Sequence, residues 1–401
     1  MTERDAIAVT GLGVVSPIGV GHAQFWSALC AGQSGIVPLA EATGVPRIAA
    51  RIAAFSPREF ITSPQLRRAD PLSRTIVAAA RMALTDAKLG TLPPEALGLV
   101  VGSALGDVGE SIQYLNRLFT KGPGLASPMM FPNLVLNAAA SYTAMELGSL
   151  GANLTVSHGD VSGELALTAA VDVIRSGRAE VVLAGGGDEL AEIVMYGYRR
   201  FRALSGQRGG DEWCSPYDRD RNGLVLGEGA AMLVLESAQR ARRRGATIYA
   251  EIADYTGFGV PASPYDWPAH APGATVCLRE WLARTLPAGA TIDAVCGNAN
   301  GSRRLDACLA EVCAAIAAPA AVTSIKGAIG EFGAAGALSA AATCLALHRG
   351  VVPPLCHLRQ PLETPLQFAA PTAQARALRH ALMFSIARGG STLALLLRRA
   401  Q

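Results

Sequence analysis

A strand–turn–helix pattern around Asp160 is the part of the sequence best suited to present a side chain for chemistry. Residues 153–157 form a short β-rich run, Gly159 and Gly163 permit a tight reversal, and Ser162 suits the start of an apolar-faced helix. A side chain at such an elbow points into a pocket, and the positive end of the following helix favours an anion there. Asp160 could equally be an ordinary cap or turn residue, and this segment alone leaves both interpretations open.

The elements around the elbow alternate between strand and helix in both halves of the chain. This alternation predicts parallel-dominated sheets covered by helices on both faces, in a duplicated α/β architecture. We expect one half over residues 1–245 and the other over residues 246–401. The expected strands are residues 6–15, 97–101, 153–157, 181–184, 230–236, 249–255, 292–297, 321–325, 381–387 and 392–398, and the expected helices are residues 24–30, 70–87, 134–147, 162–177, 276–286, 305–317 and 334–348.

The composition excludes several classes of protein. The 401 residues are 50% hydrophobic and 17% charged, which is enough apolar material for one large core or two fused cores. The formal net charge is +3 and no long basic run is interleaved with aromatic residues, so a nucleic-acid partner is not indicated. We expect a cytoplasmic protein without a membrane segment, because no secretory signal and no long uncharged apolar stretch are apparent.

The cysteines and histidines do not form a recognisable metal or disulfide pattern. Eight cysteines are scattered without Cys-x-x-Cys spacing, which favours reduced and mostly buried thiols. Six dispersed histidines show no metal-binding spacing either. We therefore expect neither a metal nor a cofactor.

Three stretches together resemble the β-ketoacyl-acyl-carrier-protein synthase family. Residues 8–19 look like the family's opening strand, and residues 215–229 resemble its internal signature around Pro-Phe-Asp and Gly-Glu-Gly. Residues 324–336 resemble its lysine segment, with Lys326 as the lysine. The resemblance covers the chain nearly end to end. It implies a duplicated thiolase-like fold, layered α-β-α-β-α.

The chemistry of that family needs a cysteine at the elbow and two histidines that assist decarboxylation of malonyl carrier protein. In register with the family, these three positions hold Asp160, Asn298 and Glu331. A carboxylate is a poor nucleophile toward a thioester, an asparagine cannot shuttle a proton, and Glu331 would repel the developing negative charge. The replacements predict a site without independent condensing activity.

Within the family, the resemblance is closest to the chain-length factors, or ketosynthase β-subunits, of type II polyketide systems. It implies an active ketosynthase subunit, in a heterodimer, and an acyl carrier protein as partners. The elbow residue of this branch is commonly Gln, so Asp160 departs from the pattern. Arg388 stands at or next to the usual gating phenylalanine. We expect Lys326 and Arg388 to neutralise Asp160 and Glu331 in one buried pocket.

The resemblance also places residues 127–137 at the dimer interface. Met129, Met130 and Phe131 are therefore the expected interface or tunnel residues, although packing in this chain's own core is an alternative explanation. Two other functions remain open. The chain could be a homodimeric thiolase-fold enzyme that uses Asp160 or Glu331 as a general base on an acyl thioester, or a scaffold that never contacts an acyl group.

Overall fold

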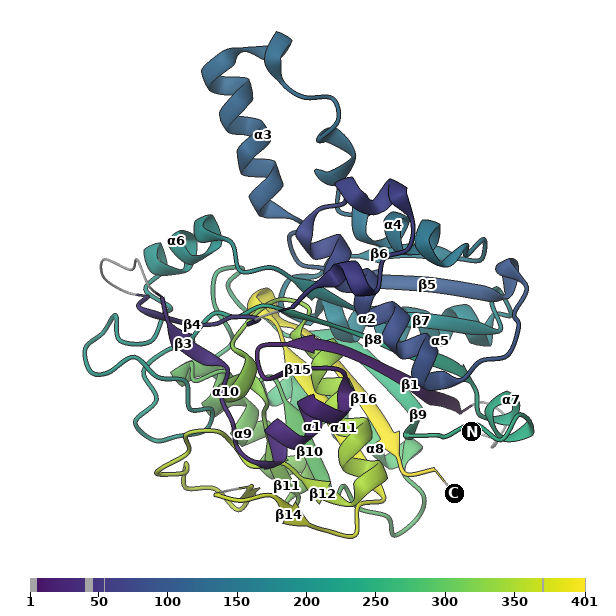
Figure 1. Ribbon diagram of the computed structural model, residues 1–401. Coiled ribbons are helices and arrows are strands. Elements are labelled where there is room, and N and C mark those ends of the chain that lie inside the picture. Colours follow the sequence, from purple (N-terminus) through teal and green to yellow (C-terminus); the bar gives the residue numbers. More distant parts are fainter. Residues whose placement is uncertain (1–5, 40–45, 54, 370, 401) are drawn as a thin grey trace.

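The two halves of the chain meet at an antiparallel pairing between β1 (Ile7–Ser16) and β9 (Ala250–Gly259). The computed structural model describes residues 6–39, 46–53, 55–369 and 371–400. Through the β1–β9 pairing the strands form one continuous order, β13-β11-β10-β15-β16-β9-β1-β8-β7-β5-β6 (Figure 1). First-half and second-half strands therefore lie on opposite sides of one junction.

Each half repeats the same strand pattern, which is the duplication expected from the sequence. Three parallel strands are followed by two antiparallel strands that lead to the junction. The first half contributes β5 (Leu97–Gly102), β6 (Asn153–Val156), β7 (Val181–Asp188) and β8 (Gly229–Ser237) besides β1, and the second half contributes β10 (Ala294–Gly297), β11 (Ala321–Thr323), β15 (His380–Ile386) and β16 (Ser391–Arg398) besides β9, with β13 (Gln367–Phe368) beyond β11.

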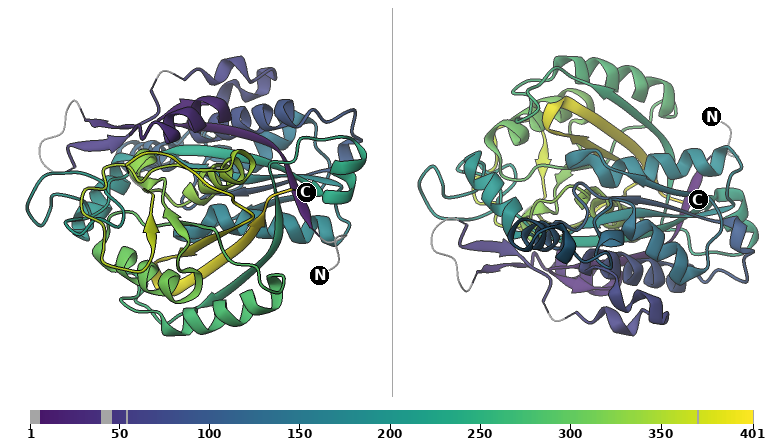
Figure 2. Two further views of the ribbon diagram at one scale, coloured as in Figure 1. Left: turned by 90° about the horizontal axis from the view of Figure 1, so that it is seen from below. Right: turned by 90° about the horizontal axis from the view of Figure 1, so that it is seen from above.

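Helices cover both sheets and also fill the space between them. Two helices pack on the outer face of the first-half sheet, two lie between the halves, and two pack on the outer face of the second half. Figure 2 shows the first-half elements and the second-half elements stacked as successive layers. The order α-β-α-β-α that the resemblance implied is therefore confirmed. The six helices are, in that order, α2 (Pro71–Ala87) and α4 (Ala138–Leu147), α5 (Ser162–Arg175) and α11 (Ala335–Arg349), and α8 (Pro272–Thr285) and α9 (Arg303–Ala317).

The middle layer depends on a close approach between α5 and α11. A Cβ atom on Gly163 would lie 2.5 Å from the backbone nitrogen of Ala337. A Cβ atom on Gly336 would lie 1.8 Å from Oε2 of Glu164. Position 163 therefore requires glycine, because a Cβ atom there would clash with backbone atoms of the facing helix. At position 336 the clash is with the carboxyl group of Glu164, which would have to shift. This contact holds the start of α5, and with it the elbow, against the second half.

Among the helices that the sequence pattern did not predict, two have nine or more residues. Residues 102–133 read as an irregular Gly- and Pro-punctuated region, but α3 (Val108–Lys121) forms there, with the side chain of Asp107 accepting a hydrogen bond from the Glu110 N–H at 2.7 Å. Figure 1 shows α3 extending away from the body, and none of its residues is buried. The second is α6 (Glu192–Arg200).

The remaining elements are short. The helix predicted at residues 134–147 begins only at Ala138, because residues 131–133 form a 3-10 turn that contains a proline. None of the helices in the described part of the chain is both long and apolar enough to cross a membrane. The other short elements are β2 (Gly19–Val20), α1 (His22–Cys30), β3 (Ile36–Pro38), β4 (Ile48–Ala50), α7 (Ala238–Arg243), α10 (Lys326–Ile329), β12 (Val351–Val352) and β14 (Gln374–Ala375).

Candidate functional site

The elbow forms where the sequence predicted it. A 3-10 turn over Gly159–Val161 connects the loop after β6 to α5, and Asp160 within that turn is only 4% exposed. The hydroxyl of Ser162 closes the turn, because it accepts from the His158 N–H at 2.9 Å and donates to the Gly159 carbonyl at 2.8 Å. The Asp160 carboxylate makes its hydrogen bonds to Arg388 and none to the N–H groups of α5. Asp160 is therefore not a helix cap.

Arg388 lies in the turn between β15 and β16 and holds Asp160 from the second half of the chain. Its Nε and its backbone N–H each donate to Oδ2 of Asp160 at 3.0 Å, and Nη2 donates to Oδ1. The guanidinium also lies 4.7 Å from the ring centre of Tyr198 and 5.4 Å from that of Trp267. Burial alone would raise the pKa of Asp160, but the charge and the hydrogen bonds of Arg388 together lower that pKa.

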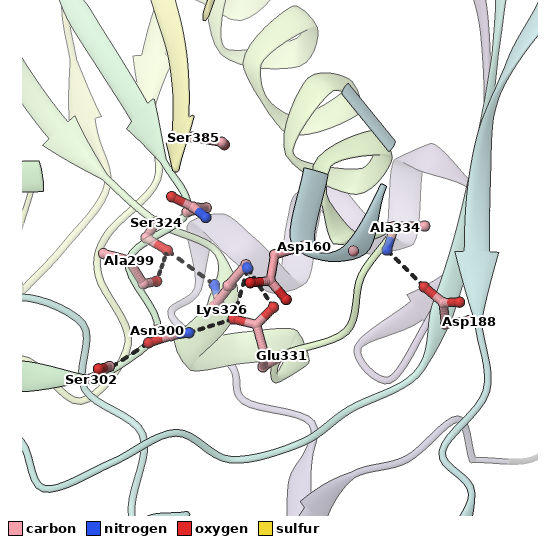
Figure 3. Close-up of polar contacts among 12 residues, drawn as sticks. Asp160, Asp188, Ala299, Asn300, Ser302, Ser324, Lys326, Glu331, Ala334 and Ser385 are labelled. Atoms are coloured by element: carbon pink, nitrogen blue, oxygen red, sulfur yellow. Dashed lines mark hydrogen bonds and ion pairs between the residues drawn. The ribbon is translucent and has the colours of Figure 1, made fainter. Parts of the chain in front are cut away.

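Lys326 and Glu331 form the second ion pair of the site (Figure 3). Nζ of Lys326 lies 2.7 and 2.8 Å from the two carboxylate oxygens of Glu331, and both side chains are 2% exposed. The side-chain amide of Asn300 donates to Oε2 of Glu331 at 2.5 Å. Burial raises the pKa of Glu331, while Lys326 and Asn300 oppose that shift. The structure thus brings Asp160, Glu331, Lys326 and Arg388 together as two neutral pairs.

The two asparagines of the loop after β10 have different partners. Asn298, which the sequence analysis placed where the family's first histidine belongs, makes hydrogen bonds to the backbone of Ile386. Its amide donates to the Ile386 carbonyl at 3.0 Å, and its Oδ1 accepts from the Ile386 N–H at 3.2 Å. Asn300, two residues further along, is the amide that contacts Glu331. Of the two side chains, only that of Asn300 contacts the Lys326–Glu331 pair in the described structure.

A third buried carboxyl group, Glu164, was not singled out from the sequence. It lies one turn after Asp160 on α5, and its Oε1 accepts from the Ser385 hydroxyl at 2.6 Å. Its Oε2 is buried and has no hydrogen-bond partner among the described residues. Burial raises the pKa of Glu164, which favours the protonated form of this carboxyl group.

Arg388 also separates two cavities. An inner cavity of about 250 Å³ is lined by Asp160, Glu331 and Arg388 and by apolar residues such as Leu105 and Phe332. Two further carboxyl groups, those of Asp188 and Glu189, also line it. An outer cavity of about 550 Å³ lies on the other side of Arg388. Because Leu105 is more than half exposed, the inner cavity reaches the surface beside the base of α3.

The arrangement leaves little capacity for acid–base or nucleophilic chemistry. Both oxygens of Asp160 are bonded to Arg388, and both oxygens of Glu331 are bonded to Lys326. A carboxylate held in this way by a cation is a weak base. Cys214, whose sulfur lies 3.5 Å from the Lys326 carbonyl, is buried, and burial raises the pKa of its thiol.

Met129, Met130 and Phe131 lie away from these ion pairs, between α3 and α4. Met129 and Phe131 are 57% and 59% exposed, so they do not pack in the core of this chain. The sulfur atoms of the two methionines contact arginine side chains, Arg68 at 3.9 Å and Arg117 at 3.6 Å. Met129 and Phe131 therefore lie on an exposed surface and Met130 is half-buried beside them, and the expectation that the three face a partner remains a prediction.

Comparison with known proteins shows similarity to β-ketoacyl synthases over nearly the whole chain. Two family models match, "Beta-ketoacyl synthase, N-terminal domain" over residues 4–241 and "Beta-ketoacyl synthase, C-terminal domain" over residues 249–359. The 3-oxoacyl-(acyl-carrier-protein) synthase 2 of Rhizobium meliloti (strain 1021) is 32% identical, with 98% of each chain covered. The putative polyketide beta-ketoacyl synthase 1 of Streptomyces virginiae is 33% identical, with 100% of this chain and 99% of the relative covered.

Solved structures show the same likeness. A chain of "The ishigamide ketosynthase/chain length factor" superimposes with a TM-score of 0.91 at 28% identity, over 99% of this chain and 100% of that chain. A chain from a type II polyketide synthase acyl-carrier protein in complex with its hexaketide-bound ketosynthase has a TM-score of 0.87 at 25% identity, with 98% and 99% covered.

We expect Arg388→Ala to lower the free energy of unfolding by about 3–5 kcal/mol, because the substitution leaves the Asp160 carboxylate buried without its cation. The measurement is equilibrium urea denaturation. The double variant Asp160→Asn/Arg388→Met removes both charges and should recover most of the loss. Equal destabilisation in the single and double variants would show that packing, and not the ion pair, dominates at this position.

We expect Glu164→Gln to remove a pH dependence of stability. Because the folded-state pKa of Glu164 is raised above its ordinary value of 4.5, protonated Glu164 contributes its full stability below that value and loses it as pH rises through the raised pKa. Glutamine resembles the protonated form at every pH. Urea-denaturation midpoints measured from pH 5 to pH 8 should therefore fall more steeply for the unmodified chain than for Glu164→Gln.

The control is Glu59→Gln, which changes an exposed carboxyl group outside the site. Its midpoints should run parallel to those of the unmodified chain. If the Glu164→Gln midpoints did the same, Glu164 would be ionised in the folded protein.

Proposed function

The chain belongs to the β-ketoacyl synthase family, and on that basis we propose that it is a catalytically silent ketosynthase-like subunit, a chain-length factor. In this role it pairs with an active β-ketoacyl synthase and shapes the acyl or polyketide tunnel in type II polyketide or fatty-acid-like biosynthesis. The observation that carries the proposal is the ion pair at the elbow, in which Arg388 binds the carboxylate of Asp160. The sequence resemblance aligns Asp160 with the nucleophile of the family.

The position of Arg388 supports the absence of condensation. An acyl group that entered from the outer cavity would have to displace a guanidinium held by Asp160 and stacked beside two aromatic rings. That displacement would leave a charge unpaired in a buried pocket, which is costly. The same ion pairs argue against the alternative of a homodimeric enzyme with repurposed acids, because neither Asp160 nor Glu331 offers a free oxygen as a general base.

The inner cavity supports a role in holding an acyl chain that comes from a partner. Arg388 closes the cavity beside Asp160, and Leu105 marks the place where it reaches the surface beside α3. An apolar chain would gain free energy where it contacts Leu105, Leu190 and Phe332, and it would also pass the carboxyl groups of Asp188 and Glu189. A chain held there would enter from the side of α3, and the cavity depth would limit its length.

The surface around α3 supports pairing with a second subunit. Ten of the sixteen large hydrophobic side chains that are exposed in the described structure fall within residues 105–150. Directly after this region comes β6, which pairs with β5 on one side and ends the sheet on the other. Unpaired strand edges and large apolar patches are typical of association surfaces. We extend the partners to an acyl carrier protein, because a solved ketosynthase relative is bound to one.

Co-expression with a ketosynthase that retains Cys, His and His should yield a one-to-one heterodimer, measured by native mass spectrometry. We expect Phe119→Asp to weaken this association by about tenfold or more, because it places a charge among buried apolar contacts at the interface. Phe119 lies on α3 and is 80% exposed in the isolated chain. A charge at that position would not disturb the core.

The matched control is Val276→Asp, which introduces the same charge at a half-exposed apolar residue on α8, on the far outer layer. Val276→Asp should leave the heterodimer intact. A chain that stayed monomeric with every candidate ketosynthase, or that responded equally to both variants, would overturn the pairing.

Substitutions that change side-chain volume at Met130 or Phe131 should shift product length in the assembled complex while the priming rate stays nearly unchanged. A tunnel wall limits extension by steric overlap, so Phe131→Ala should lengthen products and Met130→Trp should shorten them. Product masses report the shift, and native mass spectra verify assembly. An unchanged product distribution in both assembled variants would exclude these residues as determinants of length.

A further inference from the structure

The outer cavity has a lining that the proposed function does not use. It lies beyond Arg388, has a volume of about 550 Å³, and is bordered by the end of α6, the loops around residues 208 and 265, and the start of α9. Its size is within the usual range for small-molecule sites. Five arginines and one carboxylate supply its charge: Arg202, Arg208, Arg303, Arg304 and Arg388, with Asp266.

Three of these arginines carry charge that the protein does not balance. Arg388 is paired with Asp160, and Nη1 of Arg304 lies 2.7 Å from Asp266. Arg202, Arg208 and Arg303 have no salt bridge within 4.0 Å among the residues that the structure describes. Like charges that converge on one cavity repel each other, and a bound anion removes that repulsion.

The backbone helps to place two of these arginines beside the cavity. Arg202 adopts a φ of 54°, in the left-handed region that a non-glycine residue rarely occupies. Its N–H is held by the Arg199 carbonyl at 3.0 Å, immediately after α6 ends. Nε of Arg303 donates to the Arg221 carbonyl at 3.0 Å, so one face of that guanidinium is anchored while its other nitrogens stay available. Such planar donors match the oxygen atoms of a phosphate.

Aromatic rings stand beside the arginines. The rings of Phe201 and Tyr265 stack with centres 6.0 Å apart and planes at 26°, although both residues are more than half exposed. Trp267 also lines the cavity, and its buried indole N–H has no partner among the described residues. Exposed aromatic faces next to cations offer stacking for a planar heterocycle.

We propose that the outer cavity is a binding site for a nucleoside phosphate. Arg202, Arg208 and Arg303 hold the phosphate groups, and the base stacks against the Phe201–Tyr265 pair. The site does not depend on pairing with a ketosynthase, because every residue that forms it belongs to this chain. Two sources share this chemistry: a free nucleotide, and the nucleotide end of coenzyme A, which carries acyl groups as thioesters.

The test is calorimetric titration of the full chain with ADP in low salt, where exposed charges are least screened. We expect saturable binding that Arg208→Gln weakens by about tenfold, since it removes a charge-assisted contact to phosphate. Arg58→Gln is the matched control, because Arg58 is an exposed arginine outside the cavity. Tyr265→Ala should weaken the binding of ADP but leave the binding of inorganic pyrophosphate unchanged.

The outcomes are distinct. Absence of saturable ADP binding, or equal loss in Arg208→Gln and Arg58→Gln, overturns the site. Pyrophosphate that binds as tightly as ADP, with no effect of Tyr265→Ala, overturns the nucleoside part. Coenzyme A that binds like ADP and depends on the same residues identifies the coenzyme as the source, whereas binding of ADP alone identifies the free nucleotide. Unchanged thermal midpoints establish that each variant is folded, so a loss of binding reports on the site.

Discussion

Charge neutrality at the buried elbow is the constraint on which the rest of this site depends. Two carboxylates lie within one pocket, and each is paired with a cation. Lys326 pairs with Glu331 within the second half of the chain, whereas Arg388 reaches from the second half to Asp160 in the first. Taking a charge out of water costs several kcal/mol unless a partner and hydrogen bonds compensate it. The site therefore also joins the two halves of the chain. The elbow of the first half and the turn after β15 must meet, because each carries a buried charge that only the other neutralises.

The sequence predicted most of the architecture because its signals are local. Strand and helix periodicities marked the layers. Asp160, Lys326 and Glu331, which the elbow and lysine segments singled out, belong to the two ion pairs of the site. The sequence did not indicate that Asn300, and not Asn298, donates to Glu331, because that depends on the course of the loop after β10. The sequence marked Glu164 only as suited to the start of a helix, because its burial cannot be read from the pattern.

The helix α3 was missed for a different reason. Its flanks are rich in glycine and proline, which indicate loops, and none of its side chains is buried in this chain. Its amphipathic pattern therefore has no counterpart within the molecule that would have made a helix necessary. Arg388 likewise has a role that no local pattern reveals, because it closes one cavity and borders another only through the folding of distant segments. Sequence patterns show which surfaces are apolar, but not what covers them.

The pairing of Asp160 with Arg388 also limits how this chain could change over evolutionary time. Replacing Asp160 by a neutral nucleophile leaves the Arg388 guanidinium without its counter-charge, and replacing Arg388 first leaves the carboxylate stranded. Whichever residue is replaced first, the single variant is less stable than the present chain. Both substitutions must therefore be fixed together before a nucleophile is tolerated at position 160. The ion pair thus acts as an evolutionary ratchet, in which each partner preserves the other by selection for folding alone.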